Sequence, residues 1–93
     1  MAKLEVFKVN YVNFLGKNRV FIIVAEDMGD AKAEFLKHTT MGAPEKYNVT
    51  FQERLNLSEL KNSSSPVSEL EDNYRVSDYE FVISNGAMAK LNS

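Results

Sequence analysis

RVFIIVA, at residues 19–25, is the stretch that decides the fold. It is continuously apolar after Arg19 and rich in β-branched and aromatic side chains, which predicts a buried strand. Residues 3–14 (KLEVFKVNYVNF) precede it and largely alternate apolar and polar side chains, which predicts a second strand. Residues 15–18 (LGKN) lie between the two and have the composition of a turn. We therefore expect an antiparallel β-hairpin.

A helix is expected after the hairpin, at about residues 28–39. Asp27 is a suitable N-cap, and Asp30 places a carboxylate in the first turn, where the helix dipole favours it. The apolar residues at helical spacing are Met28, Ala31, Phe35 and Leu36. Gly42 and Pro44 then end the helix.

Residues 46–57 form the most regular alternation in the chain and predict a third strand. Its expected apolar face consists of Tyr47, Val49, Phe51, Leu55 and Leu57. Glu53 is the exception on that face. We favour the interpretation that it is an inward charge protecting an edge strand. The alternative is that it faces a ligand or a partner.

The rest of the chain is less regular. Residues 58–78 are expected to be an irregular loop, with room for one short helical turn that begins at Ser65 or Ser68 and runs through Leu70. Residues 79–83 predict a short last strand. The fold class is therefore α+β, a single domain over residues 1–93. Its mainly antiparallel sheet has about four strands in the order β-β-α-β-loop-β, and one helix packs on one face.

Residues 20–25 are apolar on both faces of their strand, and one helix covers only one face of a small sheet. Either residues 58–78 fold back over the second face, or a second copy of the chain covers it. We favour self-association as a homo-oligomer. The residues expected at the subunit interface are Val6, Phe14, Val20, Ile22 and Val24.

Composition restricts the classes of function. The 93 residues contain no cysteine and one histidine, which rules out disulfides and thiolate chemistry and argues against a metal site. The longest apolar run is far shorter than a membrane span, and no signal peptide is recognisable, so a cytoplasmic location is expected. A net charge of −2 argues against general nucleic-acid binding and against binding to anionic lipid.

No catalytic motif is recognisable, and no cofactor is expected. The glycines are isolated, so neither a phosphate-binding loop nor a dinucleotide fingerprint is present. Adjacent carboxylates such as Glu71 and Asp72 are ordinary surface features, although an activity based on carboxylates alone leaves little trace in a sequence. We expect a binding protein rather than an enzyme.

The best candidates for a ligand site combine an aromatic ring with cations, amides and hydroxyls, which suit a planar, phosphorylated ligand. They are Tyr74, Arg75, Lys46, Thr40 and Asn73. In the alternative interpretation Tyr74 anchors its segment on the core. Arg75 then pairs with Glu71 or Asp72.

Three stretches resemble the small β-hairpin-plus-helix proteins of tailed-phage genomes: residues 3–12, residues 19–25 and AEDMGDAK at residues 25–32. Several such proteins are counter-defence factors, among them the anti-CBASS sponges, which sequester cyclic-oligonucleotide immune signals. The resemblance implies a non-enzymatic homo-oligomer with nucleotide pockets between subunits, working in the host cytoplasm. It covers about a third of the chain and transfers no site residue.

A second hypothesis is a protein-binding inhibitor or adaptor. Such a protein would act through a sheet edge or through the acidic segment at residues 69–80.

Overall fold

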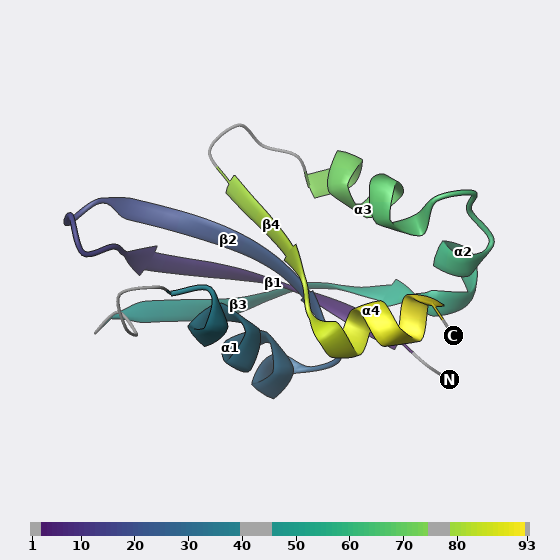
Figure 1. The fold of residues 1–93 in the computed structure, drawn as a ribbon, viewed down its shortest axis with the longest axis horizontal. Helices are drawn as coiled ribbons and strands as arrows, with labels where there is room; N and C mark the ends of the chain where they lie inside the picture. Colours follow the sequence, from purple (N-terminus) through teal and green to yellow (C-terminus); the bar gives the residue numbers. More distant parts are fainter. Residues whose placement is uncertain (1–2, 40–45, 75–78, 93) are drawn as a thin grey trace.

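A computed structural model describes residues 3–39, 46–74 and 79–92. The elements are β1 (Lys3–Val12), β2 (Asn18–Ala25), α1 (Met28–Lys37), β3 (Tyr47–Asn56), α2 (Leu57–Lys61), α3 (Pro66–Tyr74), β4 (Tyr79–Ile83) and α4 (Asn85–Asn92). The four strands form one sheet in the order β3-β1-β2-β4 (Figure 1). β1 is antiparallel to β2 and β3, whereas β4 is parallel to β2. The α+β class and the β-β-α-β order expected from the sequence are confirmed.

The hairpin turn is one feature in which the sequence-based prediction was wrong. β1 stops before Asn13, whose side-chain oxygen accepts the backbone N–H groups of Leu15 (3.0 Å) and Lys17 (2.9 Å). Gly16 adopts a positive φ of 79°, which a glycine tolerates without strain. Phe14 therefore belongs to the turn and not to the strand, and its side chain is 74% exposed.

α1 covers one face of the sheet, as expected. Asp27 caps the helix by accepting the backbone N–H of Asp30 at 2.8 Å. The buried cluster beneath it consists of Phe7, Val9, Phe21, Ile23, Ala25, Ala31 and Phe35. The ring of Phe35 lies between those of Tyr11 and Tyr47, with each centroid 5.1 Å away. Edge-to-face and tilted rings at this distance add to the free energy of area burial.

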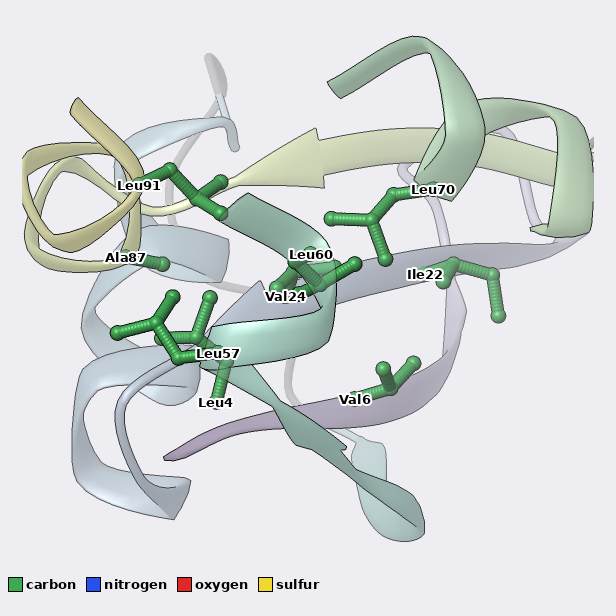
Figure 2. Packing of buried hydrophobic residues seen from close by; sticks show 9 residues of the cluster. All are labelled: Leu4, Val6, Ile22, Val24, Leu57, Leu60, Leu70, Ala87 and Leu91. Carbon is green, nitrogen blue, oxygen red and sulfur yellow. The ribbon is translucent and has the colours of Figure 1, made fainter. Parts of the chain in front are cut away.

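The second face is covered by three helices of the same chain. The buried cluster there consists of Leu4, Val6, Ile22, Val24, Leu57, Leu60, Leu70, Ala87 and Leu91. Figure 2 shows side chains from α2, α3 and α4 meeting those of β1 and β2. The expected subunit contact of Val6, Ile22 and Val24 is therefore corrected. These side chains are at most 4% exposed within one chain, so a second copy has no access to them.

Residues 58–74 are more regular than expected, and the rest of the expected loop, residues 75–78, lies outside the described residues. Asn56 caps α2 by accepting the backbone N–H of Ser58 at 3.0 Å. Pro66 occupies the first position of α3, where its missing N–H costs nothing. These short helices lack the length for a clear helical period, and the burial of Leu60 and Leu70 holds them in place. Within the described ranges, no helix is long and apolar enough to span a bilayer.

β3 contains a bulge that corrects the expected strand face. Val6 pairs with Glu53, whereas the next residue of β1, Phe7, pairs with Phe51, so Gln52 is an extra residue. The side chains on the two sides of the bulge therefore face opposite ways. Phe51 lies on the α1 face, and Glu53 lies on the face that α2–α4 cover. β3 is an edge strand of the sheet, as the interpretation of Glu53 as an edge charge requires.

Candidate ligand-binding groove

An open groove of about 630 Å³ lies at the hairpin end of the sheet. Its lining residues come from β1, β2, β3 and the residue before β3: Asn10, Tyr11, Val12, Asn18, Arg19, Val20, Lys46, Tyr47 and Asn48. In Figure 1 the hairpin turn lies at one end of the long axis of the molecule, and α2 and α4 lie at the other end. The groove is therefore built on the part of the sheet that these helices leave uncovered.

Strand register determines which side chains form the floor of the groove. Asn10 pairs with Val20 of β2 on one side and with Asn48 of β3 on the other. Val12 pairs with Asn18. Directly opposed residues of an antiparallel ladder lie on the same face of the sheet, so these five side chains form one surface. That surface is apolar at the two valines and offers amide donors and acceptors around them.

The charged residues of the lining are both cations. Arg19 donates to Glu80 of β4 at 3.1 Å, and this hydrogen bond and the negative charge of Glu80 raise the pKa of the guanidinium. Both side chains of this pair are nearly half exposed, so water screens the interaction. Lys46 is exposed and makes no ion pair with any residue that the structure describes. The lining therefore contains two cationic side chains and no acidic one, although the chain as a whole is acidic.

One of the five residues expected to bind a ligand lines this groove, namely Lys46. Tyr74 and Asn73 lie at the end of α3 and are absent from the lining. Arg75 and Thr40 lie outside the described residues. Of the residues expected at a subunit interface, Val20 is partly exposed and lines the groove, and Phe14 lies in the turn next to it.

Tyr74 has contacts within the chain. Its ring stacks on Phe81 of β4, with centroids 6.5 Å apart, and packs against the second-face cluster. Its hydroxyl lies near the carboxylate of Glu53 of β3, which contributes to the raised pKa of the phenol. The residue thus joins α3 to both edge strands of the sheet, which agrees with the anchoring alternative. It also gives the carboxylate of Glu53 an internal partner.

Burial, together with the hydrogen bond to Glu53 and its negative charge, raises the pKa of Tyr74 above the ordinary value of 10.0. The neutral phenol is thus favoured more in the folded state than in the unfolded state. The stabilisation from this residue is fully present below pH 10 and is lost as the pH rises beyond it.

In a phenolate absorbance titration of the wild type we expect one tyrosine to ionise at a higher pH than the others. Glu53→Gln should lower that pKa, whereas Glu59→Gln on α2 should leave it unchanged; equal effects of the two would contradict the contact.

The asparagines of the groove were not identified from the sequence. Asn10, Asn18 and Asn48 interrupt or flank apolar strands and look like ordinary outward-facing residues there. Only the pairing of three strands places them together. The one available signal was the repeated asparagine at polar positions of the predicted strands, and it carries little specificity by itself.

A cluster of polar groups lies at the starts of α1 and α4, and its hydrogen bonds stabilise the fold. The hydroxyl of Ser84 donates to Asp30 at 2.6 Å and accepts the backbone N–H of Ala87 at 3.1 Å, which caps α4. His38 lies at the other end of α1, where it pairs with Glu34 at 3.3 Å. The described residues therefore place no histidine beside this serine, and they contain no group of three potential metal ligands.

Comparisons of the chain with models of protein families, with curated proteins and with solved structures find no match.

Proposed function

We propose that this is a non-enzymatic binding protein whose hairpin-end groove holds a small, planar, anionic ligand of the nucleotide class. The observation that carries the proposal is the composition of the groove. Its charged lining residues, Arg19 and Lys46, are cationic, and three asparagines surround an apolar floor.

Each part of a nucleotide has a counterpart in this lining. Phosphate oxygens suit the ammonium of Lys46. The guanidinium of Arg19 pairs with Glu80, and its position opposite Tyr11 places it on the other face of the sheet from the valine floor. A base presents both donors and acceptors along its edge, and an asparagine amide offers the complementary pair. The flat surface of a base suits the apolar side chains of Val12 and Val20. The groove volume of about 630 Å³ lies within the range of sites for small molecules.

The more specific form of the proposal is sequestration of a cyclic nucleotide signal by a phage immune-evasion protein. Sequestration needs binding without chemical change, for which cations, amides and valines are sufficient. The resemblance of the hairpin and the helix entry to phage counter-defence proteins supports this form. A host-cytoplasmic location and a homo-oligomeric state belong to the same proposal.

The direct test is a calorimetric titration of the protein with a panel of cyclic dinucleotides, cyclic trinucleotides, AMP and inorganic phosphate. At a ligand concentration of 100 times the dissociation constant, a bound nucleotide should stabilise the fold by about 2.7 kcal/mol. Lys46→Ala should weaken nucleotide binding by at least about tenfold, because a charge-assisted hydrogen bond contributes on the order of 1.5–3 kcal/mol. Lys3→Ala, at the opposite end of β1, is the matched control. No heat and no melting shift with any nucleotide would reject the proposal.

A second candidate is the protein-binding inhibitor or adaptor, which one observation favours. Glu69, Glu71 and Asp72 are all exposed on α3 and present an acidic surface. The sheet edge is a weaker version of this candidate, because β3 carries a bulge and the exposed charges Glu53 and Arg54, which discourage strand addition. A stoichiometric host protein that is recovered with the wild type and lost after charge reversal on α3 would support this function over nucleotide binding.

A further inference from the structure

Asn85 is the only asparagine of the chain that is followed by a glycine. In this dipeptide the side-chain amide is lost without any enzyme, because glycine puts no side chain in the way of its own backbone nitrogen and leaves the backbone free to bend. The side chain of Asn85 is exposed, and Gly86 is half-buried. The two residues begin α4, so a change at this amide acts on the start of that helix.

Ser84, the residue before α4, holds the start of the helix. Its hydroxyl accepts the backbone N–H of Ala87 at 3.1 Å, and its carbonyl accepts that of Met88 at 2.9 Å. The N–H of Gly86 is one of the first-turn donors that no carbonyl of the helix reaches, and none of the described residues accepts it. Within the described chain, the nitrogen of Gly86 is therefore not engaged in a hydrogen bond.

The close approach of Glu26 explains why position 86 is a glycine. A Cβ atom at this position would lie 3.0 Å from Cδ of Glu26 and 3.1 Å from its Oε2. The other carboxylate oxygen of Glu26 pairs with Lys90 of α4 at 3.4 Å. A side chain at position 86 would displace this carboxylate, so the contact of Glu26 with α4 favours the reactive dipeptide.

We propose that Asn85 deamidates spontaneously, at a rate set by the opening of the first turn of α4. The backbone nitrogen of Gly86 attacks Cγ of Asn85 and closes a succinimide ring. The bond from Cγ to Nδ2 breaks, and Nδ2 leaves as ammonia with the proton of the Gly86 N–H. Water then adds to one of the ring carbonyls and opens the ring, which gives either aspartate or isoaspartate at this position.

The helical conformation restrains this reaction. The succinimide fixes ψ of Asn85 away from the helical value of about −42°, so the ring closes only after the first turn has opened. Ser84 opposes this opening, because its hydroxyl also donates to Asp30 at 2.6 Å and its side chain is fully buried. The amide is therefore lost through local opening of α4 and not through unfolding of the whole chain.

The two products have opposite effects on α4. Aspartate places a carboxylate in a first turn that has no acidic residue, where the helix dipole favours it. Isoaspartate runs the main chain through its own β-carbon, and this extra atom separates Ser84 from Ala87 and breaks the cap. Ala87 and Leu91 then lose their positions in the second-face cluster. Since the ammonia is not recovered, the isoaspartate fraction loses the cover of α4 permanently.

The test is peptide mapping by mass spectrometry of the full chain after incubation at neutral pH, with fragmentation that distinguishes isoaspartate from aspartate. We expect Asn85 to lose its amide before any other asparagine. Ser84→Ala should accelerate the loss roughly fivefold, the factor that the loss of a helix cap implies for opening. Ser68→Ala, at an exposed serine of α3, is the matched control and should leave the rate unchanged. Circular dichroism should confirm that both variants fold.

Hydrogen exchange of the α4 amides measures the consequence for the fold. It should become faster as isoaspartate accumulates in the wild type and stay constant in Asn85→Gln, whose longer side chain disfavours ring closure. Val9→Ala truncates the core beneath α1 and destabilises the chain without contact to Ser84. Equal acceleration of the amide loss by Val9→Ala and by Ser84→Ala would show that global unfolding sets the rate, and it would overturn the inference. Faster loss at another asparagine, or an intact Asn85 amide in Ser84→Ala, would overturn it as well.

Discussion

Leu70→Ala is expected to lower the free energy of unfolding by about 2–5 kcal/mol, the usual range for a large-to-small change in a core. Leu70 is 0% exposed and is the buried residue of α3. A helix of nine residues is not stable alone in water, so α3 depends on this side chain for its position over the sheet. Its truncation leaves a cavity against β1 and β2 on the second face, and urea denaturation measures the loss.

Leu36→Ala is the matched control, because it makes the same change in a helix at a leucine that is 42% exposed on α1. It should cost less than about 1 kcal/mol, as most surface substitutions do. Equal effects of the two substitutions would mean that α3 does not cover the sheet. In that case the second face would again require cover from another chain.

The sequence predicts that both faces of the sheet must be packed against other residues. It does not show which residues pack on the second face. Residues 20–25 are apolar at every position, and this pattern requires packing on both faces of the sheet. The covering helices, α2, α3 and α4, have at most nine residues each. Such short segments show too few turns for a helical period, and their conformation depends on contacts with residues distant in sequence. The pattern therefore predicts that the second face is covered and leaves open whether residues 58–78 or a second copy covers it.

The bulge in β3 shows why a period-2 pattern alone does not predict the faces of a strand. A period-2 pattern assigns Phe51 and Leu55 to one face, and it does so only while the pairing with the neighbouring strand keeps its register. One extra residue, Gln52, moves the two side chains to opposite faces. No local feature of the sequence distinguishes this residue from a regular outward-facing glutamine.

The candidate site was predictable only in part, for the same reason. Lys46 was identified because a cation beside a loop is a common anion contact. Asn10 and Asn48 are far apart in the sequence and become neighbours only when β1 pairs with β3. Tyr74 was a reasonable choice for a ligand contact by residue type, yet its ring and hydroxyl both have partners within the chain.

Asp30→Ala is expected to lower the free energy of unfolding by about 2–4 kcal/mol, because its carboxylate has two partners in segments far apart in the sequence. One carboxylate oxygen of Asp30 accepts both the hydroxyl of Ser84 at 2.6 Å and the backbone N–H of Glu26 at 3.0 Å. Ser84 is 0% exposed, so removal of its acceptor leaves a buried donor without a partner. Hydrogen bonds to charged groups contribute about 1.5–3 kcal/mol, and an orphaned buried group adds a desolvation cost.

Asp27→Ala is the comparison that distinguishes the effect of losing the Ser84–Asp30 hydrogen bond from the effect of losing a helix cap. It removes the N-cap of α1 and should cost about 1 kcal/mol. A double-mutant cycle between Asp30→Ala and Ser84→Ala, measured by urea denaturation, should show a coupling of at least about 1 kcal/mol. Additive effects would show that the two residues act independently. A measured coupling would mean that the hydrogen bond between Ser84 and Asp30 stabilises the contact between the start of α1 and the start of α4, more than fifty residues apart in sequence.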